Sequence, residues 1–126
     1  PGRTVLPDGR VVACSFEPFD AALLEAHRSS PAPGCELLDA DRLQPPLSCR
    51  PRRDGDSFVP LGAPGRQSVS DFLTNLKLPR SRRAEVRCIC DELGIVYVAP
   101  LRIDNRVRLQ DSTRWVLRIT ICPDFC

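Results

Sequence analysis

The stretch RPRRDGDSFVPLG, residues 50–62, combines three arginines, two aspartates, two glycines and two prolines within thirteen residues. No helical or strand-like apolar period runs through it. Glycine and proline mark turns, and aspartates beside a glycine commonly cap backbone amides, as Asp54 and Asp56 can do on either side of Gly55. We therefore predict an ordered functional loop over residues 50–65, with a paired-carboxylate catalytic site as the minor alternative.

Two short helices are predicted after this loop. Apolar residues at i, i+3, i+4 and i+7 define one helix face: Val69, Phe72, Leu73 and Leu76. Ser68 and Asp71 have the spacing of a capping-box variant at its start. Pro79 ends this helix and can occupy the first position of a second one over residues 79–85.

The chain beyond these helices is predicted to form strands. Residues 86–90 and 95–99 flank a turn at 91–94 and make a hairpin, and a short strand follows at 106–109. Apolar residues then alternate with Val116, Arg118 and Thr120 in a half-buried closing strand. The core face of that strand is predicted to carry Trp115, Leu117, Ile119 and Ile121.

Before the loop, residues 1–20 indicate a hairpin, 21–28 a short helix entered from Asp20, and 36–38 a brief strand. Strands, two short helices and more strands predict an α+β domain with a mixed or antiparallel sheet. The 126 residues, 42% apolar and 27% charged, fit one compact domain. Because the sequence has no methionine and no signal-peptide pattern, we expect a segment of a larger protein.

The charges are distributed unevenly. Residues 1–49 hold four arginines against seven carboxylates, whereas residues 50–126 hold thirteen arginines and one lysine against nine carboxylates. Guanidinium groups suit phosphate recognition. Positive side chains cluster at the start of the second helix, where the free backbone amides of the helix can also bind a phosphate. The sequence favours nucleic-acid binding and a merely solvated charged face about equally.

Catalytic and membrane signatures are missing from the sequence. It contains no phosphate loop, nucleophile elbow or H-E-x-x-H pattern, and one histidine, His27. No apolar run approaches the roughly 20 residues of a membrane span. Catalysis by this chain is therefore not expected.

Seven cysteines without regular spacing favour reduced thiols in a cytosol over a disulfide framework. Cys88 and Cys90 form a C-x-C within a predicted strand, and zinc binding with Cys122 and Cys126 is the minor alternative to buried thiols. We predict no metal site.

The loop also carries a resemblance to a known family. Residues 50–62 resemble the R-x-R-x-x-G-D-x-F-x-P-L-G segment of the carboxy-terminal domains of tRNA(Ile)-lysidine synthetases. The resemblance covers about residues 47–121 and continues through 69–73, 77–80, Arg83, 95–98, 101–104 and 106–107. It implies a three-layer α/β domain of the type shared with the phenylalanyl-tRNA synthetase β chain.

The resemblance also implies a function. In that family a separate catalytic domain with an S-G-G-x-D-S loop uses ATP and Mg²⁺ to modify the wobble cytidine of a minor isoleucine tRNA with lysine. That loop is not in this chain, so we expect no catalytic residue and no cofactor here. The expected role is an accessory tRNA-binding domain of a cytoplasmic ligase, with tRNA and its own catalytic domain as partners and no membrane.

The predicted site follows from these observations. Five cations are expected to contact phosphates: Arg50, Arg53, Lys77, Arg80 and Arg83. Four residues are expected to shape the loop: Gly55, Asp56, Phe58 and Gly62. Leu61, Phe72 and Leu76 should help Phe58 to anchor the loop and helix. Arg102 and Asp104 are either a structural pair or ligands.

The predicted segmentation is a lead-in over residues 1–46, the family-like domain over 47–122 and a tail over 123–126. A domain that orients its catalytic partner without touching RNA is the alternative function, motivated by the acidic first third and by Gln67 and Ser68, which stand where the family often has lysines. A small independent enzyme is the third hypothesis.

Overall fold

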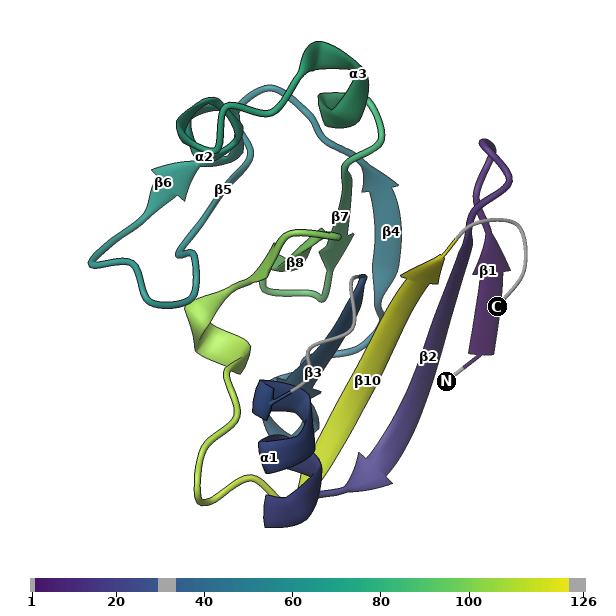
Figure 1. The fold of residues 1–126 in the computed structure, drawn as a ribbon, viewed down its shortest axis with the longest axis vertical. Helices are drawn as coiled ribbons and strands as arrows, with labels where there is room; N and C mark the ends of the chain where they lie inside the picture. Colours follow the sequence, from purple (N-terminus) through teal and green to yellow (C-terminus); the bar gives the residue numbers. More distant parts are fainter. Residues whose placement is uncertain (1, 30–33, 123–126) are drawn as a thin grey trace. The chain divides into compact units, whose positions relative to one another are not determined.

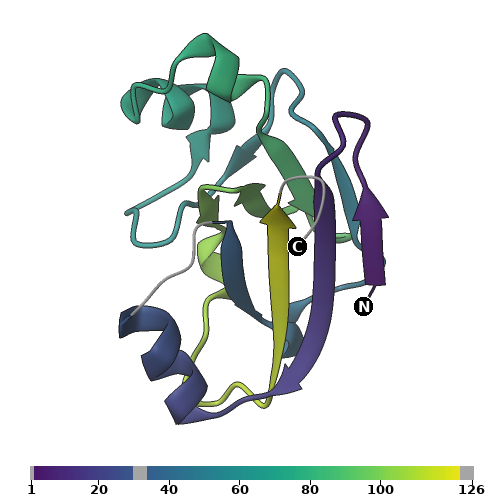
Figure 2. The same cartoon turned by 45° about the vertical axis from the view of Figure 1, so that its right-hand side comes forward.

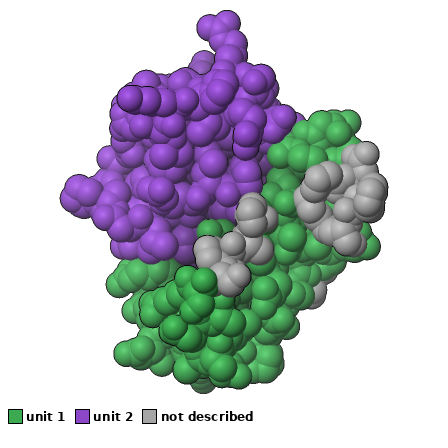
Figure 3. Space-filling model, in the orientation of Figure 1, with its two compact units in different colours: residues 1–42, 108–126 green, residues 43–107 purple. Residues whose placement is uncertain are grey.

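The computed structural model describes residues 2–29 and 34–122. It divides into two compact units, residues 1–42 with 108–126 (unit 1) and residues 43–107 (unit 2) (Figure 3). Among the described residues, no helix is long and apolar enough to cross a membrane.

Unit 1 is built on a four-stranded antiparallel sheet in the order β1-β2-β10-β3 (Figure 1). The strands are β1 (Gly2–Val5), β2 (Val11–Pro18), β3 (Cys35–Asp39) and β10 (Trp115–Cys122). Helix α1 (Ala21–Ser29) begins after Asp20, whose carboxylate accepts a 2.8 Å hydrogen bond from the Ala22 amide. The 3-10 helix η1 (Ala40–Arg42) follows β3. Because β10 pairs with both β2 and β3, the last strand completes a sheet begun by the first residues.

Unit 2 holds a second antiparallel sheet and a small hairpin. The sheet order is β4-β7-β8-β9, with β4 (Ser48–Pro51), β7 (Arg87–Cys90), β8 (Ile95–Ala99) and β9 (Arg102–Ile103). The hairpin pairs β5 (Ser57–Phe58) with β6 (Gln67–Ser68). Helices α2 (Val69–Asn75) and α3 (Arg80–Arg83) precede β7, and the 3-10 helix η2 (Asn105–Val107) follows β9.

The core of unit 2 joins the hairpin, α2 and the sheet. Phe58 and Phe72 are buried, and their rings meet edge to face with centroids 5.1 Å apart. Val86, Cys88 and Val98 of the sheet side belong to the same cluster. Burying aromatic side chains supplies a large part of the apolar area that stabilises a small unit. This packing fixes the loop and α2 against the sheet.

Most predicted elements are confirmed. Ser68 caps α2, with its hydroxyl oxygen accepting a 3.0 Å hydrogen bond from the Asp71 amide. The turn at 91–94 closes the β7-β8 hairpin through the Asp91 amide and the Gly94 carbonyl. The predicted α+β class is confirmed, and every strand pair in the described residues is antiparallel.

Three local predictions are wrong. The predicted strand at 106–109 is replaced by η2, because the Asp104 carboxylate accepts a hydrogen bond from the Arg106 amide and starts a helical turn. Trp115 is 51% exposed at the first position of β10, where alternation predicts a core residue. Leu61 and Leu76 are 41% and 39% exposed, so neither is a buried anchor.

The two units are interleaved in sequence, whereas the predicted segments 1–46, 47–122 and 123–126 are consecutive. The difference arises because β10 belongs to the sheet of β2 and β3. The tail at 123–126 lies outside the described residues.

Candidate nucleic-acid interface

The loop that follows β4 is organised by one carboxylate. Asp56 accepts two hydrogen bonds from the Arg50 guanidinium, at 2.9 Å from Nη1 to Oδ2 and 2.8 Å from Nη2 to Oδ1. The Arg53 amide also donates to Asp56 Oδ2, at 2.6 Å, and the Cys88 thiol lies 3.7 Å from it. The Arg50 guanidinium and the Arg53 amide hold the pKa of Asp56 below its ordinary value, although partial burial opposes them. Arg50 is therefore committed to holding the loop together.

The backbone of this loop connects it to α2. The Asp56 carbonyl accepts from the Val69 amide at 2.9 Å, at the first residue of α2. Gly55 has φ +87°, a conformation that side-chain-bearing residues rarely adopt. The next turn contains Gly62, with φ +85°. These contacts place the loop at the start of α2.

A pH dependence follows from the Asp56 contacts. Because its pKa is lower in the folded protein than the value of about 3.9 in an unfolded chain, its contribution to stability is complete near neutral pH and is lost as pH falls through the folded pKa. We expect Asp56→Asn to cost about 2 kcal/mol at pH 7 and much less near pH 2. Urea unfolding at both pH values measures this, with Asp54→Asn, at an exposed neighbour, as the control. An equal cost at both pH values would contradict the assignment.

The junction between α2 and α3 contains a strained cation. Lys77 has φ +57°, the left-handed conformation usually taken by glycine after a helix. Its amide donates to the Thr74 carbonyl at 2.9 Å, and the Leu78 amide donates to the Leu73 carbonyl at 3.4 Å, which is the Schellman pattern. Lys77 itself is exposed. A lysine at this position makes the fold less stable than a glycine would, and it places a positive charge on the surface.

This strain yields a second prediction. We expect Lys77→Gly to raise the free energy of unfolding by about 1 kcal/mol, because glycine adopts this conformation without a Cβ clash. Lys77→Ala removes the same charge but keeps the strain, so it should not stabilise the protein. Thermal or urea unfolding of the two variants distinguishes them. If Lys77→Gly unfolded more easily than Lys77→Ala, the strain argument would be wrong.

The three arginines of α3 differ in their contacts. Arg83 is half-buried, and its guanidinium donates to the Leu78 carbonyl at 2.9 Å and to the Thr74 hydroxyl at 3.4 Å. Arg82 lies 3.8 Å from Glu85. Arg80 is exposed, one residue after the N-cap Pro79. Arg83 thus helps to hold the junction, while Arg80 points its charge to solvent.

The strand register brings the loop and α3 to the same end of unit 2. Pro51 in β4 pairs with Arg87 in β7, directly after the α3 segment, so Arg52 and Arg53 leave the sheet beside that segment. Figures 1 and 2 show the β4-β5 loop, α2 and α3 gathered at this end. Five exposed cations lie on these segments. Arg82 pairs with Glu85, and the other four are Arg52, Arg53, Lys77 and Arg80. We call them the basic end.

The cations of the basic end are not neutralised. Across residues 2–29 and 34–122, none of the four forms an ion pair with a carboxylate. Of the five cations predicted to contact phosphates, Arg53, Lys77 and Arg80 belong to the basic end, whereas Arg50 and Arg83 hold structural contacts. Arg52, in the same motif as Arg53, was not selected from the sequence. Exposed guanidinium and ammonium groups without a carboxylate partner suit phosphate contacts.

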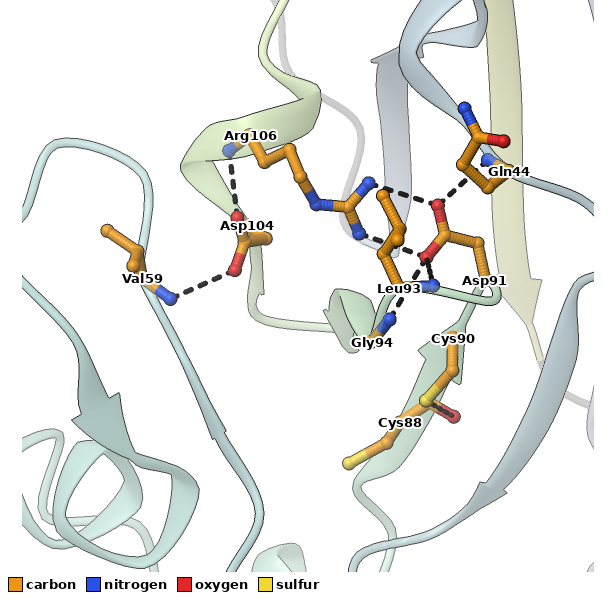
Figure 4. Close-up of polar contacts among 9 residues, drawn as sticks. All are labelled: Gln44, Val59, Cys88, Cys90, Asp91, Leu93, Gly94, Asp104 and Arg106. Atoms are coloured by element: carbon orange, nitrogen blue, oxygen red, sulfur yellow. Dashed lines mark hydrogen bonds and ion pairs between the residues drawn. The ribbon is translucent and has the colours of Figure 1, made fainter.

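A second polar network was not foreseen from the sequence. The Asp91 side chain is fully buried and forms a bidentate ion pair with Arg106, with both N–O distances 3.0 Å (Figure 4). It also accepts from the amides of Gln44, Leu93 and Gly94. Burial raises the pKa of Asp91, but Arg106 and the backbone donors outweigh it and hold the pKa low. Fifteen residues separate the pair, so no local pattern reveals it.

Arg102 and Asp104 do not form the structural pair considered from the sequence. The Arg102 guanidinium lies over the Phe72 ring, 5.2 Å from its centroid. Asp104 is buried and accepts from the amides of Val59 and Arg106 at 2.9 and 2.8 Å. Both side chains therefore have structural contacts, with different partners.

The cysteines give no indication of a metal centre. In the part of the chain that the structure describes, no group of three or more His, Cys, Asp or Glu side chains could hold a metal ion. Cys88 is buried, and burial together with the Asp56 carboxylate raises its pKa to about 12. Cys90 is also buried, and burial raises its pKa. The side chain of Cys122, and all of Cys126, lie outside the described residues.

Comparison with known proteins places this geometry in a family. Residues 47–119 match the family model described as the TilS substrate C-terminal domain. The chain belongs to this family. The matched range contains the whole basic end and the Asp91-Arg106 pair of this chain.

Individual relatives agree with the family. The chain is 33% identical over 123 residues to a tRNA(Ile)-lysidine synthase of Symbiobacterium thermophilum, covering 96% of this chain and 24% of that protein. It is 39% identical over 80 residues to the tRNA(Ile)-lysidine synthase of Parabacteroides distasonis, covering 64% of this chain and 18% of that protein. The matched segments therefore make up 18% to 24% of the length of these relatives.

Solved structures confirm the fold class. A crystal structure of a TilS C-terminal domain superposes with a TM-score of 0.75 at 22% identity, covering all of this chain and 93% of that one. An N-terminal fragment of the phenylalanyl-tRNA synthetase β-subunit from Pyrococcus horikoshii gives 0.68 at 15% identity, covering 92% of this chain and 39% of that one. The TilS C-terminal domain and the synthetase fragment share the α+β architecture predicted from the sequence.

Proposed function

We propose that this chain is the accessory tRNA-binding domain of a tRNA(Ile)-lysidine synthase. The basic end is the observation that carries the proposal: four exposed cations on adjoining segments without carboxylate partners in the described residues. Unit 2 as a whole holds eleven arginine and lysine residues against seven carboxylates, and unit 1 holds seven against nine. The excess positive charge is thus concentrated in the unit that carries the basic end.

The mode of binding follows from the kind of side chains that the basic end offers. Its four members are cations of the kinds that contact phosphate oxygens in nucleic-acid complexes, and none of them is an aromatic side chain on which an unpaired base could stack. Contacts of this type position an RNA duplex by its backbone without reading its sequence. We assign to the domain the task of holding the tRNA, and to the remainder of the synthase the recognition and modification of the wobble cytidine. ATP, Mg²⁺ and the cytoplasmic setting belong to this proposal for the full-length enzyme.

Titration of isoleucine tRNA at several salt concentrations tests the proposal. Four or five phosphate contacts predict a slope of about −3 to −4.5 when log affinity is plotted against log salt, at roughly 0.7–0.9 per contact. Fluorescence anisotropy of labelled tRNA gives the affinities. A titration that stays flat at low salt would exclude tRNA binding by this chain.

A second function is favoured by a different observation in unit 1. Phe16 and Trp115 are 45% and 51% exposed, and the pairing of Leu117 with Phe16 places both aromatics on one face of the sheet. Exposed aromatics on an acidic unit suit contact with another protein surface. This supports a domain that orients its catalytic partner without contacting RNA. In that case charge reversal at Arg53 and Arg80, two exposed members of the basic end, should leave tRNA affinity unchanged.

A further inference from the structure

Unit 2 contains an open cavity of about 280 Å³ that the basic end does not use. Its polar lining includes Ser57, Arg66 and Asp104, and its apolar lining includes Val59, Leu93 and Ile95. The volume is near the lower end of the about 300–1,000 Å³ typical of small-molecule sites, so it suits one nucleotide and not a long polymer segment.

The floor of the cavity, around Asp104, is held by hydrogen bonds. Asp104 is 6% exposed, and its two carboxylate oxygens accept from the amides of Val59 and Arg106. The Asn105 amide donates to the Val59 carbonyl at 2.7 Å, and the Leu61 amide donates to the Ile103 carbonyl at 3.1 Å. Figure 4 shows the hydrogen bonds that the Asp104 carboxylate accepts from the amides of Val59 and Arg106. A pre-formed floor lowers the entropic cost of binding a small group.

The rim supplies a positive charge. Arg66 is exposed, its Nη1 donates to the Ser57 hydroxyl at 3.0 Å, and it has no carboxylate partner among the described residues. The other cation of the lining, Arg106, is bound to Asp91 and so is neutralised locally. An anionic group that enters the cavity would therefore meet the charge of Arg66, with Ser57 as a neutral donor.

Another part of the lining is apolar although it is exposed to solvent. Leu93 is 66% exposed in the β7-β8 turn, where a polar residue would cost nothing in packing. With Val59 and the buried Ile95 it forms a surface suited to the flat face of a nucleobase. A carboxylate can accept more than one hydrogen bond at each oxygen, so Asp104 retains capacity for a ribose hydroxyl or a base amino group.

We propose that this cavity binds one unpaired nucleotide of an RNA, with its phosphate at Arg66 and its base against Leu93. The proposal rests on the proposed function and deepens it. The basic end holds the backbone of a duplex, and the cavity accepts a single nucleotide from an unpaired segment. Free nucleotides share this chemistry, so the experiment must distinguish them from RNA.

Amide NMR spectra of the chain, titrated with AMP, inorganic phosphate and a single-stranded RNA tetranucleotide, test the proposal. We expect AMP and the tetranucleotide to shift the amides of Arg66, Leu93, Gly94 and Asn105. Arg66→Gln should lower the affinity for AMP and for the tetranucleotide by about tenfold, which corresponds to the loss of one charge-assisted hydrogen bond. Leu93→Ser should lower the affinity for AMP but not the affinity for inorganic phosphate. Arg3→Gln and Val5→Ser, at exposed positions of unit 1, are the matched controls, and the same spectra report folding.

The outcomes separate this proposal from the proposed function. Shifts that avoid the cavity, or that Arg66→Gln and Leu93→Ser leave unchanged, would overturn the nucleotide site even where tRNA binds with the predicted salt slope. AMP binding that the tetranucleotide does not displace would assign the cavity to a free nucleotide and overturn the RNA assignment. If both AMP and the tetranucleotide bind in the cavity but the chain does not bind tRNA, the nucleotide site is supported and the proposed function is wrong.

Discussion

Replacing Asp91 with alanine is expected to destabilise the protein by about 3 kcal/mol. The Asp91 side chain is fully buried and pairs with Arg106 through two hydrogen bonds of 3.0 Å. Three backbone amides donate to the same carboxylate. Removing it leaves these donors unsatisfied and leaves a partly buried guanidinium without its counter-charge, which typically costs about 3–5 kcal/mol. We take the lower end because the Arg106 side chain is 29% exposed.

Urea unfolding at neutral pH measures this change. Asp111→Ala is the matched control, because Asp111 is exposed in a turn. Arg106→Ala should cost less than Asp91→Ala, since the carboxylate keeps its three backbone donors. A cost below about 1 kcal/mol for Asp91→Ala, similar to that of an ordinary surface substitution, would show that this network does not hold the turn and η2 together.

Removing three charges from the basic end is expected to lower tRNA affinity by about 100-fold at low salt. The variant combines Arg53→Gln, Lys77→Gly and Arg80→Gln. Each residue is exposed, and each substitution removes one phosphate contact worth roughly 1 kcal/mol. None of these side chains forms an ion pair in the described residues, so the fold should be retained.

The control removes the same net charge elsewhere. Arg3→Gln, Arg28→Gln and Arg114→Gln change three exposed arginines of unit 1. Their combined effect on tRNA affinity should be less than about tenfold, because charges outside the contact act only at long range and form no hydrogen bond with a phosphate. Equal losses in the two triple variants would mean that net charge alone attracts the RNA. Circular dichroism of both variants checks that they are folded.

The local elements of the fold could be predicted from sequence because their signals lie within a few residues of each other. The capping pair Ser68 and Asp71 and the apolar face of α2 both act over one or two turns of helix. Alternation also indicated the closing strand. It could not indicate which residues other parts of the chain would cover. Trp115, at the first position of β10, is exposed, whereas Val116 beside it is buried.

The candidate site was predictable only as a list of charges. Arg50 resembles its neighbours Arg52 and Arg53 in sequence, but Asp56 captures its guanidinium once the loop closes. Arg83 is likewise held by the Leu78 carbonyl. The pair of Asp91 and Arg106, and the interleaving of the two units by β10, depend on contacts between distant residues. Sequence period and spacing carry no information about such contacts.

The salt dependence of tRNA binding by the original chain and by the triple variant of Arg53, Lys77 and Arg80 tests the role of the basic end most directly. Each lost phosphate contact lowers the magnitude of the log–log slope by about 0.7–0.9, so the two slopes should differ by about 2 to 2.7. Such a difference would mean that these three side chains contact three phosphates of the tRNA. Parallel slopes, with binding retained, would mean that the tRNA contacts another surface and that the basic end is only a solvated face.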